Sequence, residues 1–269
     1  MITLGFSPCP NDTFIFYALA NRMIDTHGLD FDLHIEDVET LNRLAMSRSL
    51  DVSKISCHVF LYLQDDYRFL RSGGAFGRGC GPLIVSKVPY AMSDLRDKSI
   101  AIPGELTTAY LLLRLFFDAA FRNKPSKIVP MPFHEIPAAA RDGKVDAGLI
   151  IHESRFTYKE YGLSQVADLG EWWEKDTGLP IPLGGIITKK TLGPKVEVIE
   201  DLVRKSVEYA FPHRDQAMPF IKKHSQELST QVINSHIDLY VNDFTVDMAE
   251  EGAAALKELL GRARLADGR

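Results

Sequence analysis

The sequence predicts an α/β protein made of two lobes that are joined by two crossings. Short aliphatic runs alternate with apolar helical runs through most of the chain, which is the pattern of sheets covered by helices. A second alternating series begins near Leu95, after a glycine-rich stretch. Two prolines and two glycines in residues 179–187 then mark a return of the chain to the first lobe. We therefore expect a cleft between the lobes.

The bulk composition indicates which kinds of molecule the protein is expected to bind. The chain has 269 residues and a formal charge of −5, with its basic residues scattered, so neither nucleic acid nor an anionic membrane is an expected partner. The three cysteines, Cys9, Cys57 and Cys80, show no metal-ligand spacing, and no export signal precedes the first strand. We expect a cytoplasmic protein with reduced thiols that takes a small molecule.

The first expected strand covers residues 2–6, and a polar loop leads from it into a helical run over residues 14–20. Asn11, Asp12 and Thr13 are all good N-cap types. Such a loop can present donors to a ligand in the cleft, or it can simply cap the helix. The residues leave both readings open.

The first lobe continues with a strand over residues 31–36, a helix over 38–47 and a strand over 51–56. The last of these ends in Lys54-Ile55-Ser56, and a lysine at a strand end is either a solvated charge or a holder of carboxylate or phosphate. The glycines of residues 72–82 fit neither a P-loop nor a dinucleotide fingerprint. They are expected to permit tight turns beside a strand at 83–86.

The second lobe is expected to open with residues 95–104, a turn followed by a short strand, and to continue with a long apolar helix over residues 109–121. Gly104 lets the backbone approach a ligand, while Thr107 and Thr108 can cap the helix and offer hydroxyl groups. Strands at 128–133, 145–151 and 166–169 follow, with a helix at 134–142. Anion or carboxylate binding at the start of the long helix is the functional expectation.

His152 stands where the strand at 145–151 ends. In open α/β sheets the ligand lies outside the carboxyl ends of the strands, and an imidazole there can act as a general base near neutral pH. Most histidines at strand ends only cap a turn, and no partner is visible in the neighbouring sequence. From this stretch alone the structural role is therefore favoured.

Four helical segments close the chain, at residues 196–210, 214–224, 230–240 and 246–260, and they should pack back onto the first lobe. This organisation gives a discontinuous first lobe of residues 1–88 and 186–269. The second lobe then comprises residues 89–185. The sequence leaves monomer and homodimer open.

Several long motifs, in one order, resemble the 1,4-dihydroxy-6-naphthoate synthases of the futalosine route to menaquinone. They are residues 5–14 (GFSPCPNDTF), 36–42 (EDVETLN), 71–75 (RSGGA), 107–110 (TTAY), 148–158 (GLIIHESRFTY), 172–173 (WW) and 179–184 (LPIPLG). The likeness covers essentially the whole chain. It implies a fold like the type 2 periplasmic binding proteins, with the ligand between two α/β lobes.

The resemblance also implies a function. Members of this family release 1,4-dihydroxy-6-naphthoate from cyclic de-hypoxanthine futalosine without a metal or redox cofactor, which makes the expected enzyme a lyase. The proton-accepting histidine falls on His152, and the substrate contacts fall on Lys54, Ile55, Ser56, Thr108 and Ala109. From their places in the loops we add Thr107 and Asn11 to the expected substrate contacts.

Two other functions fit the same features. A binding protein for a small carboxylate would explain the cleft but would normally carry an export signal. Chorismate dehydratase, a sibling enzyme of the same route and fold, is less favoured because His152 is followed by Glu153-Ser154-Arg155.

Overall fold

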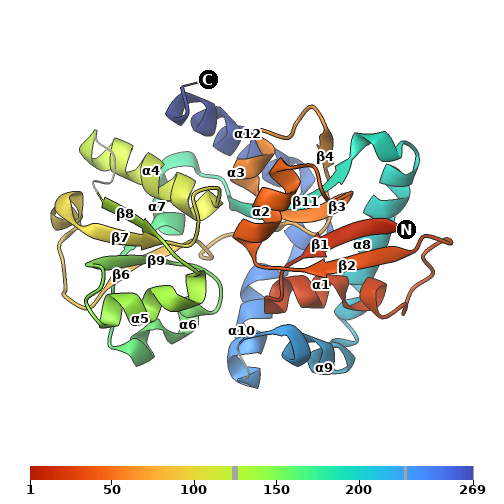
Figure 1. The fold of residues 1–269 in the computed structure, drawn as a ribbon, viewed down its shortest axis with the longest axis horizontal. Helices are drawn as coiled ribbons and strands as arrows, with labels where there is room; N and C mark the ends of the chain where they lie inside the picture. The colour runs from red at the N-terminus through yellow and green to blue at the C-terminus, as the bar shows by residue number, and fades with distance from the viewer. Residues whose placement is uncertain (123–126, 227–228, 269) are drawn as a thin grey trace.

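The computed structural model describes residues 1–122, 127–226 and 229–268. Two α/β lobes lie side by side, each built on its own sheet (Figure 1). The green and yellow lobe holds the middle of the chain, and the red, orange and blue lobe holds both ends. Both ends of the chain therefore lie in the same lobe, and the middle of the chain forms the other.

The first sheet has the strand order β2-β1-β3-β11-β4, and β5 pairs with β11 beside this path. Its central strand β3 runs parallel to β1 and antiparallel to β11. The strands are β1 (Ile2–Phe6), β2 (Phe31–Ile35), β3 (Val52–Ser56), β4 (Tyr67–Phe69), β5 (Ala75–Gly77) and β11 (Ile181–Lys189). Every residue of β3 is buried, so this strand lies inside the core of the first lobe. The residues at its end, which the sequence analysis placed at the cleft, are therefore held in position by the core.

The second sheet has the order β10-β6-β9-β7-β8. Strand β9 runs parallel to β7 and antiparallel to β6. The strands are β6 (Leu83–Ser86), β7 (Ser99–Ile102), β8 (Lys127–Pro130), β9 (Ala147–Ile150) and β10 (Ser164–Asp168). The four residues of β9 are fully enclosed, as expected for an aliphatic strand covered on both faces.

The sheets correct the expected lobe boundaries. Strand β6 pairs with β9 and β10, so it belongs to the second sheet although residues 83–88 were expected in the first lobe. All of β11 pairs with first-lobe strands, although its first five residues were expected in the second lobe. By sheet membership the crossings therefore lie between β5 and β6 and just before β11.

Helices flank both sheets. The main helices of the first lobe are α1 (Pro10–Ala20), α2 (Val38–Met46), α8 (Lys195–Ala210), α9 (Arg214–His224), α10 (Thr230–Tyr240) and α12 (Ala249–Ala266). Those of the second lobe are α4 (Thr108–Phe121), α5 (Ile136–Arg141) and α7 (Leu169–Thr177). Short helices α3 (Cys57–Phe60), α6 (Ser154–Thr157) and α11 (Asp243–Val246) link these elements.

Helix α1 begins earlier than the sequence predicted. Pro10 is its first residue and Cys9 is the N-cap, without a side-chain cap hydrogen bond. Proline favours the first helical position because its φ is already helical and it lacks the N–H that would have no partner there. Asn11, Asp12 and Thr13 therefore lie inside the helix, where the Thr13 hydroxyl donates to the Cys9 carbonyl oxygen at 2.9 Å and the side chains of Asn11 and Asp12 are available for other contacts.

The terminal helices reach farther than expected. Helices α8, α9 and α10 pack on α1 within the first lobe, whereas α12 packs on α3 and also contacts α4 of the second lobe. The largest hydrophobic cluster likewise runs from Ile55 in one lobe to Leu112 and Trp173 in the other. The two lobes thus share part of their core behind the cleft.

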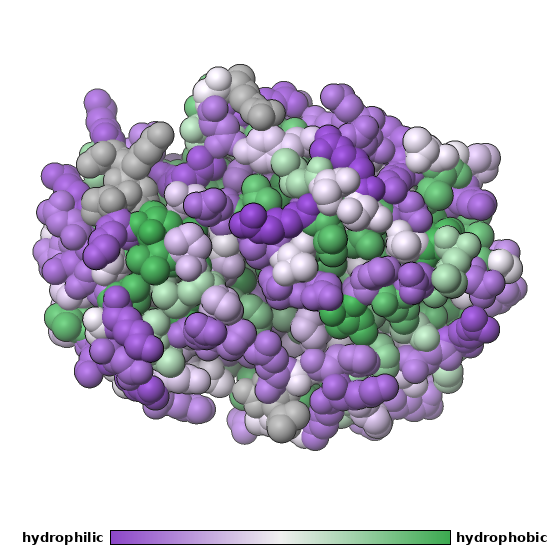
Figure 2. Space-filling view, in the orientation of Figure 1, coloured by the Kyte–Doolittle hydropathy of each residue, from purple (hydrophilic) through white to green (hydrophobic). Residues whose placement is uncertain are grey.

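The outside of the molecule is mainly polar on the face shown in Figure 2, with hydrophobic side chains in small separate groups. No helix among the described residues has the length and hydropathy needed to cross a membrane.

Candidate functional site

A cavity that is partly open to solvent lies between the lobes, where small-molecule sites commonly form. Every site residue expected from the sequence lines it: Asn11, Lys54, Ile55, Ser56, Thr107, Thr108, Ala109 and His152. Further lining residues come from both lobes and were not expected: Ser7, Asp12, Val38, Ala75, Cys80, Pro82, Ile151, Leu183, Gly184 and Tyr240. Residues from distant parts of the sequence therefore meet at one site.

A buried ion pair lies on the first-lobe side of the cavity. Lys54 Nζ lies 2.8 Å from Asp12 Oδ1, and both side chains are at most 5% exposed. The ammonium also donates to the carbonyl oxygen of Gly73 at 2.9 Å. Ser7 donates to Asp12 Oδ2 from its hydroxyl at 2.7 Å and from its N–H at 3.2 Å. Since an ammonium has three N–H groups, one donor of Lys54 is left for a ligand.

Asn11 connects this pair to a histidine that the sequence analysis did not assign. Its amide donates to Asp12 Oδ1 at 2.9 Å, and its Oδ1 accepts from His236 Nε2 at 3.0 Å. Because Oδ1 can only accept, the bond places the His236 proton on Nε2. His236 is fully buried, and burial together with the nearby His152 ring lowers its pKa well below the ordinary value. The imidazole of His236 is therefore neutral.

His152 occupies a sharp turn at the end of β9. Its φ of 55° lies in the left-handed region, which is uncommon outside glycine and often found at functional sites. The ring packs against Phe133, with centroids 5.1 Å apart, and lies parallel to the His236 ring at 6.1 Å. The backbone turn thus directs the imidazole into the cavity instead of along the sheet.

The His152 side chain has no hydrogen bond to another residue within the described ranges. Burial lowers its pKa to about 4, an effect that Asp12 opposes and Lys54 reinforces. The half-buried imidazole is therefore neutral near pH 7 and keeps a nitrogen lone pair. This is the state in which a histidine can accept a proton.

The N-terminus of α4 lies across the cavity from the ion pair. Thr107 is its N-cap, and its hydroxyl accepts from the Tyr110 N–H at 3.2 Å, as the capping expectation required. Thr108 Oγ1 accepts from the His58 N–H at 3.1 Å. Since the first N–H groups of a helix have no partner within it, Thr108 and Ala109 can present donors to a carboxylate.

Ser56 is held at the end of β3 by a buried asparagine. Asn42 accepts from the Ser56 N–H at 2.9 Å and donates to its hydroxyl oxygen at 3.1 Å. The Ser56 hydroxyl proton is consequently free to point at a ligand. Asn42 lies within the EDVETLN motif, which places that motif in a supporting position beside the cavity.

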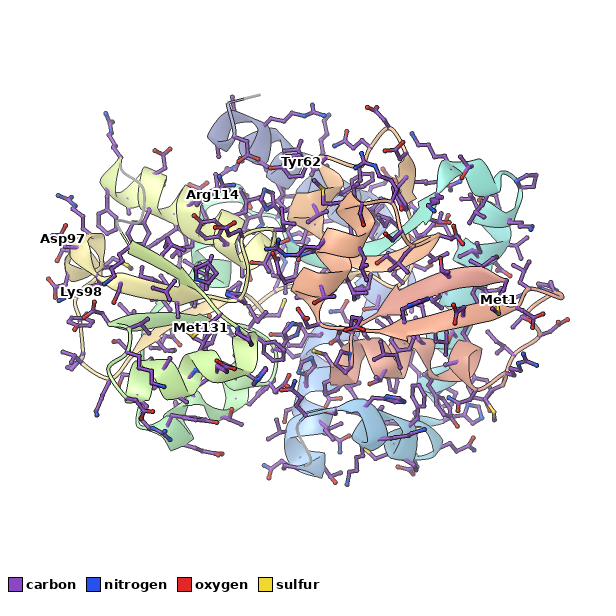
Figure 3. The ribbon with its side chains drawn as sticks, viewed as in Figure 1. Met1, Tyr62, Asp97, Lys98, Arg114 and Met131 are labelled. Carbon is purple, nitrogen blue, oxygen red and sulfur yellow. The ribbon has the colours of Figure 1, made fainter. Side chains whose placement is uncertain are left out.

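Cys57 and His58 follow Ser56 directly and are buried. His58 Nε2 lies 3.4 Å from the Tyr62 hydroxyl and 3.6 Å from Asp267 Oδ2. Asp267 in turn accepts from Arg114 of α4 at 2.8 Å, and Tyr62 and Arg114 lie near each other where α12 approaches α4 (Figure 3). His58 thus belongs to a polar contact between the lobes and does not line the cavity.

His236 is the functional candidate that sequence reasoning missed. It lies on the buried face of α10 together with Ile233, Ile237 and Tyr240. A polar residue on an otherwise apolar helix face was the available signal, since buried polar groups normally have a specific partner. That partner, Asn11, is 225 positions away in the chain.

A protein-family model described as "Menaquinone biosynthesis" matches residues 2–265 of the chain. The chain is 48% identical over 263 residues to a 1,4-dihydroxy-6-naphtoate synthase of Streptomyces coelicolor, covering 97% of this chain and 92% of the relative. It is 46% identical over 265 residues to the enzyme of the same name from Thermus thermophilus, covering 97% and 93%. These matches confirm the resemblance read from the motifs.

Solved structures support the fold. A crystal structure of a protein from Archaeoglobus fulgidus has a TM-score of 0.89 at 39% identity, and the match covers 99% of this chain and 97% of that protein. The periplasmic aliphatic sulphonate binding protein of Escherichia coli has a TM-score of 0.68 at 15% identity, with 97% and 85% covered. The second likeness shows the fold alone and confirms the expected periplasmic-binding-protein-like architecture.

The family match, the two full-length relatives and a cavity lined by every expected site residue lead to one conclusion. The chain belongs to the menaquinone biosynthesis family, and it is an enzyme of that biosynthetic route.

Proposed function

We propose that the protein is a lyase that converts cyclic de-hypoxanthine futalosine to 1,4-dihydroxy-6-naphthoate, with His152 as the proton acceptor. The two synthases that are 46–48% identical support the reaction. The observation that carries the assignment of the base is the His152 ring, which is neutral, faces the cavity and has no hydrogen bond to another described residue.

In the proposed mechanism the neutral imidazole removes one proton from the bound cyclic substrate. The electron pair left behind breaks the bond to the sugar-derived portion, and formation of the aromatic naphthoate ring favours the products. No metal or redox cofactor takes part in this scheme. The protein's contribution is to place the base and to keep water away from it between the lobes.

The substrate carboxylate is proposed to bind at the N-terminus of α4. The N–H groups of Thr108 and Ala109 and the hydroxyl group of Thr108 are the donors at this end of the cavity. Thr107 would act by capping the helix, since its hydroxyl group already binds Gly104 and Tyr110. The remaining N–H of Lys54 and the hydroxyl proton of Ser56 would hold oxygen atoms on the opposite side.

Asn11 is proposed to act through its neighbours. Both ends of its amide are already bonded, to Asp12 and to His236, so it can offer a ligand only its second N–H. Its main effect would be to keep the Asp12–Lys54 pair in place.

The location of the protein in the cytoplasm stays a prediction. The oligomeric state, monomer or homodimer, stays a prediction as well.

The test is turnover of cyclic de-hypoxanthine futalosine by wild type, His152→Ala and His134→Ala, with naphthoate release followed by chromatography. Loss of a general base should cost at least about 100-fold in kcat, because base catalysis contributes about that much or more. His134→Ala is the matched control, since His134 lies in the same lobe with a half-exposed side chain and should retain activity.

Two outcomes would contradict the proposal. If folded His152→Ala keeps activity within about tenfold of wild type, another group is the base. If wild type binds the compound but never converts it, the protein is a binding protein of this fold. A chorismate assay on the same preparations separates the sibling dehydratase from both.

A further inference from the structure

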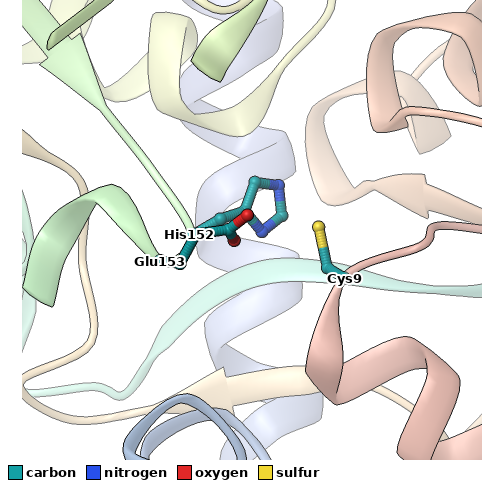
Figure 4. Close-up of side chains that lie close together, drawn as sticks. All are labelled: Cys9, His152 and Glu153. Atoms are coloured by element: carbon teal, nitrogen blue, oxygen red, sulfur yellow. The ribbon is translucent and has the colours of Figure 1, made fainter. Parts of the chain in front are cut away.

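Three side chains of different chemistry converge beside the cavity from both lobes. The Cys9 thiol, the His152 imidazole and the Glu153 carboxylate each offer one ligand atom, and these atoms all lie within 4.8 Å of one another. Cys9 precedes α1 in the first lobe, whereas His152 and Glu153 follow β9 in the second (Figure 4). The thiol points toward the imidazole, next to which the carboxylate lies.

Sulfur, nitrogen and oxygen in this combination are the ligands that Zn²⁺ binds in proteins. A thiolate, a carboxylate and a neutral imidazole would give a Zn²⁺ complex with no net charge, which suits a site where Cys9 is 4% and Glu153 9% exposed. Zinc needs ligands about 2.0–2.3 Å from the metal. The three atoms would therefore have to draw together by roughly 1 Å, within reach of side-chain rotations.

A fourth group lies beside this cluster, next to Glu153. His236 Nδ1 lies 3.9 Å from Glu153 Oε2 and has no hydrogen-bond partner within the described part of the chain, although the residue is fully buried. Because Nε2 carries the proton that Asn11 accepts, Nδ1 keeps its lone pair. A buried acceptor without a donor is costly, and a bound cation would satisfy it.

We propose that Cys9, His152 and Glu153 form a binding site for a soft divalent cation, with Zn²⁺ as the best fit, and that the bound ion inhibits the enzyme. On binding, the Cys9 thiol loses its proton to solvent as the sulfur–zinc bond forms, and no electron is transferred. The ion occupies the lone pair of His152 and joins the two lobes across the cleft. Binding of the ion is independent of the proposed reaction, and only the inhibition depends on it.

The test is a calorimetric titration of the whole protein with Zn²⁺, using wild type, Cys9→Ser and Cys80→Ser. Cys80 is the matched control because its thiol is also buried and it lines the neighbouring cavity, but among the described residues it belongs to no such cluster. We expect one ion per chain in wild type and Cys80→Ser. In Cys9→Ser the affinity should fall at least about tenfold, since even outer-shell changes cost that much.

Cobalt gives a second readout that does not depend on activity. Co²⁺ bound to a thiolate shows a sulfur-to-metal charge-transfer band in the near ultraviolet. The band should appear with wild type and Cys80→Ser and be absent with folded Cys9→Ser, and Glu153→Gln should weaken Zn²⁺ binding as well. Circular dichroism spectra of the variants establish that they are folded.

The results separate the two proposals. Zn²⁺ affinity that is equal in wild type, Cys9→Ser and Glu153→Gln would overturn the site, as would a wild type that binds no ion at micromolar concentrations. If naphthoate release is observed, Zn²⁺ should abolish it and a chelator should restore it; activity that survives a saturated site would overturn the inhibition. A wild type that binds Zn²⁺ but has no turnover would contradict only the proposed function.

Discussion

The two lobes contribute polar groups to the cleft in opposite ways. On the first-lobe side, Lys54, Asp12, Asn11 and His236 are bonded to one another in a continuous chain. On the second-lobe side, the His152 ring contacts Phe133 but has no hydrogen bond to another residue in the described part of the protein. One side is a fixed polar surface, and the other presents a side chain whose lone pair is available.

The contrast shows how a protein separates support from reactivity. A buried charge must be paired to be tolerated, and a paired group has little capacity left for chemistry. Burying a neutral imidazole without a hydrogen-bond partner costs less free energy than burying an unpaired charge. The lone pair of His152 can therefore stay available for a substrate in the cleft. If this comparison is correct, substitutions in the first-lobe chain should affect stability most, and His152→Ala should affect turnover with little effect on stability.

The largest effect is expected from Lys54→Met. It leaves the Asp12 carboxylate buried without its cation, and breaking one side of such a pair costs about 3–5 kcal/mol of unfolding free energy. Urea unfolding measures the change. Lys175→Met is the control, because its pair with Glu171 is exposed and is worth about 0.5 kcal/mol or less.

The same pair offers a rescue experiment. Lys54→Met combined with Asp12→Asn removes both charges, so it should recover a large part of the stability lost in the single variant. A Lys54→Met protein as stable as the Lys175→Met control would show that the first-lobe chain is not under electrostatic constraint. The comparison between the lobes would then fail.

A smaller loss is expected from His236→Phe. The ring shape is roughly kept, but Asn11 Oδ1 loses its donor inside the protein, which costs about 1–3 kcal/mol. Urea unfolding again measures the effect, with the half-exposed His134→Phe as control, expected within about 0.5 kcal/mol of wild type. If the two variants are equally stable, the hydrogen bond between Asn11 and His236 of α10 contributes nothing to the free energy of unfolding.

The next effect belongs to the second lobe. Thr107→Ala removes the hydroxyl that caps α4, for a loss of about 1 kcal/mol, whereas Thr107→Ser keeps the hydroxyl and should recover most of it. Because the cap also fixes the N–H groups at the cleft, KM should rise more in the alanine variant than in the serine variant. Identical unfolding free energies for the two variants would rule out the capping role.

Much of the fold could be predicted because it depends on local patterns. The aliphatic run before His152 predicted the buried strand β9, and the Thr107-Thr108 pair predicted the start of α4. The sheet to which β6 belongs could not be predicted, because a short apolar run fits either lobe equally well. The start of α1 was misplaced because cap-forming side chains were given more weight than Pro10.

The site was predictable where a motif carried it. Lys54 and Ser56 belong to the carboxyl-terminal part of β3, and His152 comes shortly after β9, so their place near the strand ends followed from the order of the elements. Asp12 was expected only as a helix cap, and its ion pair with Lys54 depends on the packing of two elements that are 42 positions apart in the chain. Such contacts between distant segments leave no periodic signal in one sequence.

The smallest effect tests the polar contact between the lobes outside the cleft. Burial opposes ionisation of Asp267, but hydrogen bonds from Tyr62 and Arg114 outweigh it and hold the pKa of this carboxyl below its ordinary value. A lowered folded-state pKa means that the stabilisation is fully present above the unfolded-state pKa, about 3.9, and is lost as pH falls through the folded-state pKa. Asp267→Asn should therefore be less stable than wild type by about 0.5 kcal/mol at pH 7, and the difference should vanish at the acid end.

Urea unfolding at pH 7 and at an acid pH below the lowered folded-state pKa of Asp267 measures this convergence, because a protonated Asp267 resembles asparagine in charge. Asp238→Asn is the control, since Asp238 is mostly exposed in its pair with Arg214 and should give a smaller difference at both pH values. A difference for Asp267→Asn that stays constant with pH would assign the effect to packing. In that case the contact between the lobes behind the cleft is stabilised by their shared hydrophobic cluster. Charged side chains would then contribute to stability only in the cleft.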